Sequence, residues 1–466
     1  MSISSASLSS SYSQIQQLAE SPDLLLLHRL NPERYPYLLA STASGSVNTR
    51  YDILFACPQA CLELRSDHAL YLDDVKLDST DFLDELNARY HQAAAGIQLI
   101  SDQPFSGGWF VYLGYELAGQ IEPVLKLPQT ESCLPVAFAT RIPCAIIHDK
   151  ALQKTSLVCE QSYAYLQADI LQDIQRITAE KANYTSPQIS HLEEEDENIY
   201  ITGVNRIKQY IIDGDVFQVN LSRAWHAELQ NHVDDADIFH ALSKSNPAPF
   251  AGLVRHKGVT IISSSPERLV HTNGNLVETR PIAGTRPRGA NKQADDRFSD
   301  ELLAHPKERA EHIMLIDLER NDLGRICIPG TVRANELMVL ESYAHVHHIV
   351  SNVQGTLRPD ILPGDVIRAV FPGGTITGCP KVRCMEIIAE LEHTSRDAYT
   401  GSMGYLEHNG NMDLNILIRT MTCCNDRLTF RAGAGIVADS IAENEVQETR
   451  AKARGMLLCL TNVANL

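Results

Sequence analysis

Short apolar runs separated by polar turns predict a strand-rich layer in the first 185 residues. Among these runs, "FSGGWFVYLGYELAG" at 105–119 predicts a strand, a tight turn and a short helix. The runs that we interpret as strands are "LLLLHRL" at 24–30, "YDILFA" at 51–56, "VAFATRI" at 136–142 and "CAIIH" at 144–148.

After residue 200 the apolar positions follow both helical and alternating patterns. Gly214 is suited to end a helix whose apolar face carries Ile201, Val204, Ile207 and Ile211. Neighbouring strands with irregularly placed helices favour an α+β fold with antiparallel sheets over a regular β-α-β alternation. Long helices are predicted over 305–325 and 443–460, and strands over 217–225, 258–269, 274–284 and 427–438.

The clearest boundary is the segment "TSPQISHLEEEDENIY" at 185–200. Pro187 interrupts regular structure, and residues 193–197 form an unbroken acidic run that is typical of a solvated connection. We therefore divide the chain into an N-terminal accessory region at 1–185 and a catalytic region at 186–466.

The charge balance restricts the partners of the chain. Its 466 residues include 40 basic and 58 acidic side chains, for a net charge of −18. Such a surface repels nucleic acid and anionic membranes, and no apolar run approaches the roughly 18 residues of a membrane span. The eleven cysteines are scattered without C-x-x-C spacing, and the N-terminus lacks the features of a signal peptide, so we expect reduced thiols and a cytoplasmic location.

Three glycine-rich segments are suited to hold an anion. "FPGGTITGCPK" at 371–381 is not a phosphate loop, because Cys379 and Pro380 separate its last Gly from Lys381. "GAGIVA" at 433–438 lacks the following strand and acid of a dinucleotide site, but its exposed backbone amides could hold a carboxylate. "PIAGTRPRG" at 281–289 joins two glycines to two arginines.

Acidic side chains on two predicted helices suggest a hard metal ion. Glu445, Glu448 and Lys452 share one helical face, and Glu311 precedes an apolar stretch of the other helix. If the carboxylates converge, they could hold Mg²⁺; if they do not, this is an ordinary solvated face with an internal ion pair.

Glu267 and three histidines are further candidates for chemistry. Glu267 lies in the turn of "SSSPERL", sixteen residues before Ala283 of the "PIAGTRPRG" segment. Strand alternation would place His347 and His348 on opposite faces, so a single catalytic histidine is favoured over a metal cluster that includes His345.

Taken together, these segments resemble the chorismate-utilising enzymes over residues 198–458. The motifs that carry the resemblance are "DVFQVNLSR", "SPERL", "PIAGTRPRG", "RAEHIMLIDLERNDLGR", "HHIVS", "FPGGTITGCPKVRCMEII", "GSMGYL", "MDLNILIRT", "AGAGIVADS" and "EVQETRAKA". The resemblance implies an α+β fold of two stacked antiparallel sheets with helices packed outside. Because no segment here resembles a glutamine-hydrolysing site, we expect either a separate amidotransferase partner or free ammonia at high concentration as the source of nitrogen.

The same resemblance implies a role for each candidate residue. Mg²⁺ would be held by Glu311 and Glu448, with Glu445 beside them in a direct or water-mediated contact. Loss of the C4 hydroxyl of chorismate would be assisted by Glu267 and His348. The substrate would be bound at its ring by Thr375, at its ring carboxylate by Lys452, and at its enolpyruvyl side by Arg419, Tyr405 and the amides of Gly433, Ala434 and Gly435.

Two positions bear on the branch of the family. Gln218 replaces the lysine with which isochorismate synthases activate water, which disfavours that reaction. "FPGGTITG", "RYDILFACP" and "GIVADS" resemble the aminodeoxychorismate synthases, Mg²⁺-dependent enzymes of the aminotransferase class on the route to 4-aminobenzoate and folate. Ala283, however, matches the anthranilate synthases, since many of the former branch carry a nucleophilic lysine there.

A binding protein without catalysis is the remaining alternative. "YPYLLASTASG" at 35–45 loosely resembles the tryptophan-sensing segment of anthranilate synthases, with Ala40 in place of the usual Glu, which weakens a feedback role for Ser41. The complete set of acidic and histidine candidates favours an enzyme over a chorismate or tryptophan sensor.

Overall fold

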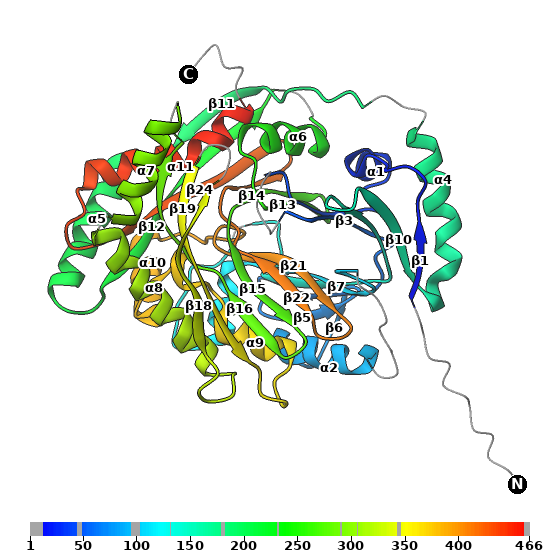
Figure 1. The fold of residues 1–466 in the computed structure, drawn as a ribbon, viewed down its shortest axis with the longest axis horizontal. Coiled ribbons are helices and arrows are strands. Elements are labelled where there is room, and N and C mark those ends of the chain that lie inside the picture. The colour runs from blue at the N-terminus through cyan, green and yellow to red at the C-terminus, as the bar shows by residue number, and fades with distance from the viewer. Residues whose placement is uncertain are drawn as a thin grey trace, which may run out of the picture.

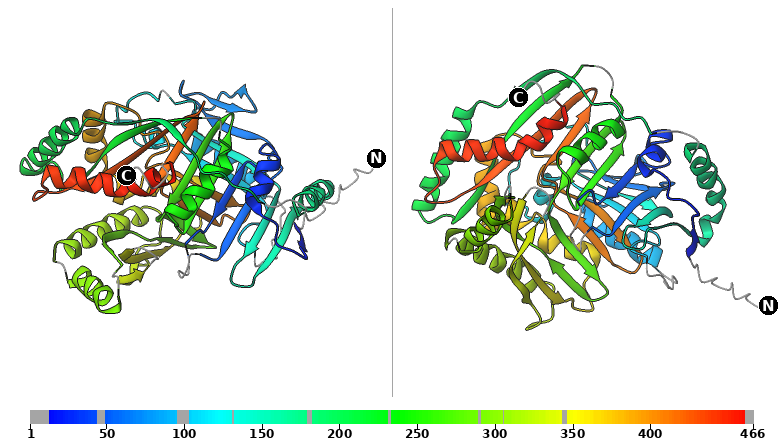
Figure 2. Two further views of the ribbon diagram at one scale, coloured as in Figure 1. Left: turned by 90° about the horizontal axis from the view of Figure 1, so that it is seen from above. Right: turned by 45° about the horizontal axis from the view of Figure 1, so that its top comes forward.

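Two antiparallel sheets of twelve strands each form the body of the protein (Figure 1). The computed structural model describes residues 13–43, 49–94, 103–130, 132–178, 182–230, 233–288, 291–304, 306–342 and 346–460. The α+β fold expected from the sequence is confirmed, with helices on the outer sides of the sheets (Figure 2).

The first sheet mixes strands from both ends of the sequence. Its order is β1-β10-β9-β3-β2-β13-β14-β23-β24-β12-β11, and β20 pairs with β12. The bounds are β1 Ser13–Gln17, β2 Tyr37–Ala40, β3 Tyr51–Ala56, β9 Cys144–Asp149, β10 Lys154–Glu160, β11 Ile189–Glu194, β12 Gln218–Leu229, β13 Phe250–His256, β14 Val259–Ser265, β20 Gly378–Cys379, β23 Thr420–Cys424 and β24 Arg427–Ile436.

The second sheet is built in the same way. Its order is β17-β19-β16-β15-β22-β21-β7-β8-β4-β5-β6, and β18 pairs with β19. The bounds are β4 Cys61–Leu64, β5 Leu70–Leu72, β6 Val75–Lys76, β7 Gly108–Leu113, β8 Ala137–Ile142, β15 Arg268–Asn273, β16 Leu276–Thr279, β17 Ile282–Pro287, β18 Arg333–Ser342, β19 Val346–Thr356, β21 Ser402–Glu407 and β22 Met412–Asn415.

Helices cover the sheets, with α5, α6, α10 and α11 beside the first and α7, α8 and α9 beside the second. None of the helices in the described segments combines the length and the apolar composition needed to cross a membrane. The bounds are α1 Leu24–Leu30, α2 Phe82–Ala94, α3 Ala118–Ile121, α4 Gln167–Thr178, α5 Glu197–Ile212, α6 Asp235–Ser245, α7 Lys292–Ala304, α8 Pro306–Gly324, α9 Pro363–Val370, α10 Lys381–Glu392 and α11 Ala442–Leu460, with 3₁₀ turns η1 Tyr115–Leu117, η2 Gln161–Leu166 and η3 Gly374–Ile376.

The boundary that we drew at residue 185 falls between α4 and β11, yet both sheets run across it. In the first sheet β2 pairs with β13, and in the second β7 pairs with β21. Stacked aromatic rings such as Tyr37 and Phe110, whose centroids lie 4.2 Å apart, fill the space between the sheets. The accessory region therefore shares its core with the catalytic region.

One strand prediction was wrong. The run "LLLLHRL" forms the helix α1, in which Asp23 caps the N-terminus by accepting hydrogen bonds from the amides of Leu25 and Leu26. Leucine favours helices, and Arg29 lies in the last turn, where positive charge is stabilising. A short continuous apolar run fits either a strand or a helix, and here the Asp23 cap stabilises the helix.

The predicted helices near the site are present. α5 ends at Ile212, and Gly214 adopts a φ of 83° that suits glycine after a helix. Its buried face carries Tyr200, Val204 and Ile207, close to the face expected from the sequence. α8 and α11 match the two long helices that carry the candidate metal ligands.

Candidate active site

Glu267 lies in the turn between β14 and β15 and is almost completely buried. Its backbone is held from both sides: its N–H donates to Ser265 Oγ at 3.2 Å, and its carbonyl accepts from the Ile416 N–H at 3.0 Å. Among the described groups its Oε1 has no hydrogen-bond partner. A rigid turn therefore presents an unsatisfied buried carboxyl oxygen, which is unusual unless a ligand completes it.

Burial raises the pKa of Glu267 to about 7, against smaller lowering effects of the Thr375 hydroxyl, the Ile282 amide and the Lys452 ammonium. The carboxyl is thus poised to give or take a proton near neutral pH. Thr375, in η3, lies beside this carboxyl, but within the described chain its hydroxyl makes no hydrogen bond of ordinary geometry.

His348 lies in β19, opposite Thr285 of β17, and is also buried. Burial lowers the pKa of His348 to about 4, so its ring is neutral at pH 7. Its Nδ1 lies 3.4 Å from the Gly284 carbonyl, which can only accept, so Nδ1 carries the proton. Gly284 itself sits at a bulge of β17 with a φ of 69°, a conformation that suits glycine.

The glycines of β24 direct their amides out of the sheet. Gly433 and Gly435 pair with Ser222 and Asn220 of β12, but the N–H groups of these two β12 residues bond to Glu392 and to the Thr377 carbonyl instead. In an antiparallel ladder such pairs turn their backbone groups away from each other. The N–H groups of both glycines therefore point away from β12, whereas Ala434 bonds to β12. On that other side of β24, β23 pairs only as far as Phe430, so the side is open at Gly433 and Gly435.

Two basic side chains reach this open side. Arg419 directly precedes β23, is desolvated so that its pKa is lowered, and forms no ion pair among the described residues. Lys452 of α11 donates to the Gly433 carbonyl at 2.9 Å. Arg419 also acts electrostatically on His348, and Lys452 on Glu267. These contacts and electrostatic interactions link one group of residues, which we call the pocket, and its two cationic side chains suit an anion. The group consists of Glu267, His348, Thr375, Arg419, Lys452 and the glycine amides of β24.

Tyr399 belongs to this group, although the sequence analysis did not select it. Its hydroxyl lies 2.7 Å from the position that a Cβ on Gly433 would occupy, and it interacts with the charge of Arg419. Burial raises its pKa to about 12, so the phenol stays protonated. The sequence signal that could have identified it is its position directly before "TGSMGYL".

Tyr405, which we had placed with these ligands, lies elsewhere. It faces a cavity of about 590 Å³ between the sheets, with Phe55 and Phe105 packed against its ring. The motif "YTGSMGY" contains two tyrosines, and the strand β21 carries the second of them away from β24. The same cavity is lined by Ala40, from the segment that resembles a tryptophan sensor, and by the ion pair of Arg268 with Asp413.

The carboxylates assigned to Mg²⁺ lie on α8 and α11. Glu311 and Glu445 are half-buried and Glu448 is exposed; Glu445 and Glu448 both act on the buried hydroxyl of Tyr200. Oxygen donors of this kind fit Mg²⁺, which commonly takes one or two carboxylates and keeps several waters. The three carboxylates do not meet within 4.8 Å of one another.

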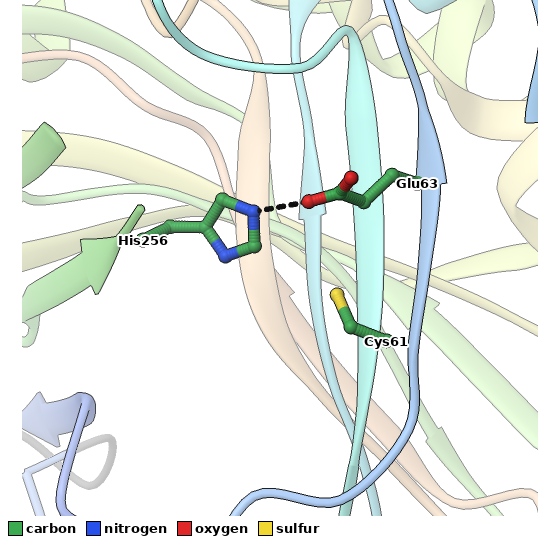
Figure 3. A group of neighbouring side chains, drawn as sticks. All are labelled: Cys61, Glu63 and His256. Atoms are coloured by element: carbon green, nitrogen blue, oxygen red, sulfur yellow. Dashed lines mark hydrogen bonds and ion pairs between the residues drawn. The ribbon is translucent and has the colours of Figure 1, made fainter. Parts of the chain in front are cut away.

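The side chains that do meet so closely, among the described residues, are Cys61, Glu63 and His256 (Figure 3). His256 lies 2.7 Å from Glu63, and Lys257 and Arg65 also bind this carboxylate. These partners outweigh burial and lower the pKa of Glu63 to about 2. Since these partners already balance the negative charge of the Glu63 carboxylate, we interpret the cluster as a polar link between β4 and β13 rather than a metal centre.

A buried ion network that no sequence motif indicated supports the pocket. Glu392 of α10 accepts from Arg396 at 2.6 Å, from Arg431 at 3.2 Å and from the Ser222 amide at 2.8 Å. Arg396 also donates to the carbonyls of Asn220 and Ile376. The network therefore ties the turn that carries Thr375 to β12.

Two further acids lie behind Glu267. Burial raises the pKa of Glu319 to about 8, helped by the charge of Asp322, and Glu267 acts on it in the same direction. Asp322 is paired with Lys381 at 2.6 Å. These buried charges and acids line the inner side of η3, where Glu319 Oε1 lies 3.4 Å from the position of a Cβ on Gly374.

Two positions distinguish branches of the family, and the structure describes Gln218 in full and the backbone of Ala283. Gln218 packs its amide nitrogen against Gly435, and its Oε1 has no hydrogen-bond partner among the described groups. Ala283 lies in β17 opposite Ile349. Neither side chain can act as a base or a nucleophile.

A scan of family models matches the chorismate binding enzymes over residues 39–458. An anthranilate synthase component I-like protein of Synechocystis is 42% identical over 387 residues, 81% of this chain and 78% of that protein. The aminodeoxychorismate synthase component 1 of Bacillus subtilis is 50% identical over 260 residues, which cover 56% of this chain and 55% of that protein.

A solved structure agrees with these sequences. Anthranilate synthase component I from Streptococcus pneumoniae superposes with a TM-score of 0.78 at 31% identity, covering 88% of this chain and 93% of the other. The matched family region contains every residue of the pocket described above and all strands of the two sheets except β1 and the start of β2. The chain therefore belongs to the family of chorismate-binding enzymes.

Proposed function

We propose that the chain is the synthase component of an aminodeoxychorismate synthase, on the route to 4-aminobenzoate and folate. It joins ammonia to C4 of chorismate, releases the C4 hydroxyl as water and retains the enolpyruvyl group. The observation that carries the proposal is the buried Glu267 carboxyl, with a pKa of about 7, in a pocket that also holds Arg419 and Lys452.

Chorismate has two carboxylates, and the pocket offers two cationic side chains. Arg419, with the outward amides of Gly433 and Gly435, suits the enolpyruvyl carboxylate, because a guanidinium and backbone N–H groups bind carboxylates in forked geometry. Lys452 suits the carboxylate on the ring. Thr375 then lies against the ring, beside Glu267.

Glu267 and His348 have different tasks in this proposal. A protonated Glu267 can donate its proton to the C4 hydroxyl as the C–O bond breaks, which contributes roughly 10²–10⁴ in rate for a positioned acid. His348 is neutral at pH 7 and serves as a hydrogen-bonding partner rather than a cationic acid. The two environments keep the two pKa values apart, as general acid–base sites require.

Glu311 and Glu448 would hold Mg²⁺, with Glu445 beside them in a direct or water-mediated contact, since the three carboxylates do not all lie within 4.8 Å of one another. The ion would supply positive charge at the ring carboxylate. Their all-oxygen character fits this ion better than zinc.

The position of the new C–N bond rests on sequence. The motif "FPGGTITG" and the 50% identity to the B. subtilis aminodeoxychorismate synthase favour C4. Because Ala283 supplies no lysine nucleophile, nitrogen attacks as ammonia directly or after another small nucleophile has added at C2. Ala283 and the 42% identity to the Synechocystis protein favour the alternative, an anthranilate synthase component that aminates C2 and releases pyruvate.

Product analysis tests the proposal. The purified chain is incubated with chorismate, Mg²⁺ and an ammonium salt, with and without a lyase that converts aminodeoxychorismate to 4-aminobenzoate. We expect 4-amino-4-deoxychorismate, and 4-aminobenzoate only when the lyase is added. Anthranilate with pyruvate would establish the alternative, and binding of chorismate or tryptophan without turnover would establish a sensor.

The ammonia source is tested in the same assay. A separate glutamine amidotransferase subunit is the proposed source in the cell, so the isolated chain is expected to use ammonium but not glutamine. Glutamine-dependent turnover by the pure chain would contradict this part of the proposal.

A further inference from the structure

Three cysteines meet in the core beneath α1 and α4, far along the first sheet from the chorismate pocket. Cys144 Sγ and Cys159 Sγ lie 2.7 Å apart, and the Cys57 thiol also interacts with Cys144. All three belong to one apolar cluster and none is bonded covalently. Cys144 is thus the central member of a row of three thiols.

The backbone allows Cys144 and Cys159 to be cross-linked. They face each other on β9 and β10, and the Glu160 N–H donates to the Pro143 carbonyl in the next pair along. Since hydrogen-bonded and non-hydrogen-bonded pairs alternate, Cys144 and Cys159 form a non-hydrogen-bonded pair, with Cα atoms about 4.5 Å apart. That separation lies within the range of natural disulfides.

The sulfur spacing argues against a metal site. Two thiolates on one tetrahedral zinc ion, each at about 2.3 Å, lie about 3.7 Å from each other. The 2.7 Å between Cys144 and Cys159 is shorter than this and closer to the length of a disulfide. Redox chemistry therefore fits these thiols better than metal binding.

Cys57 is the member of the row that is nearest to solvent. It is 8% exposed, whereas Cys144 and Cys159 are 1% and 0% exposed. It follows β3 in a left-handed conformation with a φ of 58°, and its N–H donates to the Arg34 carbonyl. A hydrogen bond from Cys144 and the charge of Arg34 lower the pKa of Cys57, against burial, and thiolates are the reactive form.

We propose that Cys57, Cys144 and Cys159 form a site that reacts with peroxide and ends in a disulfide between Cys144 and Cys159. The Cys57 thiolate attacks one oxygen of hydrogen peroxide; an S–O bond forms, the O–O bond breaks and hydroxide leaves. Cys144 then attacks the sulfur of the sulfenic acid, a disulfide to Cys57 forms and water leaves.

In the last step Cys159 attacks Cys144, and Cys57 leaves as a thiolate that accepts the proton from Cys159. Two thiols have lost two electrons, and peroxide has become one water and one hydroxide, which becomes the second water by taking up the proton that Cys57 released when it ionised. The proposal is independent of the function proposed above, because none of these cysteines touches the chorismate pocket.

Peptide mapping under non-reducing conditions tests the site. Reduced protein is treated with hydrogen peroxide, alkylated in denaturant and digested with trypsin, which cleaves at Lys150 and Lys154, between the two cysteines. We expect the peptides 142–150 and 155–176 to be joined by a disulfide. A Cys133→Ser background removes the other pair of described thiols in contact, Cys133 and Cys424 at 3.3 Å.

Two variants separate the steps. Cys57→Ser is expected to slow the cross-link at least tenfold, and Cys159→Ser to accumulate a Cys57–Cys144 disulfide. Cys423→Ser, at a cysteine outside the row, is the matched control. It should change neither the rate of the cross-link nor the disulfide that forms. If the variants do not fold, alkylation of native wild-type protein gives a second measure: Cys57 should react before Cys144 and Cys159.

The opposite results would overturn the proposal. Cys144 and Cys159 that remain fully alkylatable after peroxide has oxidised Cys133 and Cys424 in the wild type would show that the row is inert. A cross-link that forms at the same rate in Cys57→Ser would show that Cys57 is not the first thiol to react.

Discussion

Lys452 Nζ lies 2.8 Å from Glu448 Oε1, one turn away on α11, and 2.9 Å from the Gly433 carbonyl. The side chains are 35% and 49% exposed, so this ion pair contributes little to stability. Its importance is positional: one lysine connects the strand that holds the substrate amides to the carboxylate assigned to Mg²⁺. Metal and substrate binding are therefore expected to depend on each other.

Replacing Glu448 tests that assignment. Glu448→Gln is expected to lower turnover at least 100-fold at low Mg²⁺ while the circular dichroism spectrum is unchanged, because a neutral amide is a poor ligand for a hard dication. Turnover is measured against Mg²⁺ concentration. Glu443→Gln, at an exposed acid of the same helix, is the matched control. Near-normal turnover of Glu448→Gln and of Glu311→Gln at low Mg²⁺ would refute the site.

Gly433 has no room for a side chain. A Cβ there would lie 2.6 Å from the Leu221 carbonyl oxygen, 2.7 Å from the Tyr399 hydroxyl and 2.8 Å from Asn220 Oδ1. Because the first of these atoms is backbone, Gly433→Ala should displace β24 from β12, lower stability by about 1–3 kcal/mol and raise KM for chorismate more than tenfold.

Thermal denaturation and steady-state kinetics check this prediction. Gly324→Ala is the control, since a Cβ there meets no atom within 4 Å. An unchanged KM in Gly433→Ala would mean that this strand does not contact the substrate.

Glu267 predicts a pH dependence with a definite sign. As a general acid it must be protonated, so kcat is expected to fall as the pH rises through about 7. The pH profile of kcat measures this, and Glu267→Gln should remove the transition and most of the activity. Glu228→Gln, at an exposed acid of β12, should leave the profile unchanged.

The same group affects stability in the opposite direction from an ion-paired acid. Its pKa is higher in the folded chain than in the unfolded chain, so the folded state binds the proton more tightly, and this stabilisation is lost as the pH rises toward 7. Glu267→Gln should therefore be more stable than the wild type by up to about 3 kcal/mol at pH 8 and nearly equal to it at pH 4. Equal unfolding free energies at pH 8 would contradict the raised pKa.

Much of the pocket could be predicted because its residues occur in short, distinctive segments. Gly433, Arg419 and Lys452 belong to different motifs. Lys452 contacts Gly433 directly, and Arg419 is linked to it through Tyr399. The α+β fold could be predicted from the alternating strands, since sheet periodicity is local. Tyr405 was misplaced because a motif does not reveal which of two nearby tyrosines faces the pocket.

What sequence patterns could not indicate are features that arise only from packing. The helix α1 depends on the cap at Asp23, which looks like an ordinary turn residue beside four leucines. From its position at the end of an amphipathic helix, Glu392 would be expected to be solvated. In the structure it is buried between Arg396 and Arg431, which come later in the chain. Long-range contacts of this kind leave no periodic signal.

Ala283→Lys tests whether the pocket resembles that of the lysine-using branch. If its geometry is suitable, a fraction of the variant should gain the mass of a chorismate-derived adduct after incubation with chorismate and Mg²⁺, as seen by intact mass spectrometry. Lys292, at the start of α7, serves as the internal control: the adduct should map to residue 283 and not to it. An adduct at Lys292 would indicate non-specific reaction.

Glu392 provides the last prediction, which concerns the support of the pocket. Its carboxylate accepts from Arg396 and Arg431, and all three side chains are at most 8% exposed. Glu392→Gln would leave two buried guanidiniums without their counter-charge, and breaking a buried pair in this way costs about 3–5 kcal/mol. Glu386→Gln removes a half-exposed partner of Arg383 on the same helix and should cost about 0–1 kcal/mol. Urea denaturation of both variants measures the difference.

Because Arg396 also binds the carbonyls of Asn220 and Ile376, Glu392→Gln should raise KM for chorismate even where the protein is still folded. A stability loss equal to that of Glu386→Gln would show that the network is not the support described here.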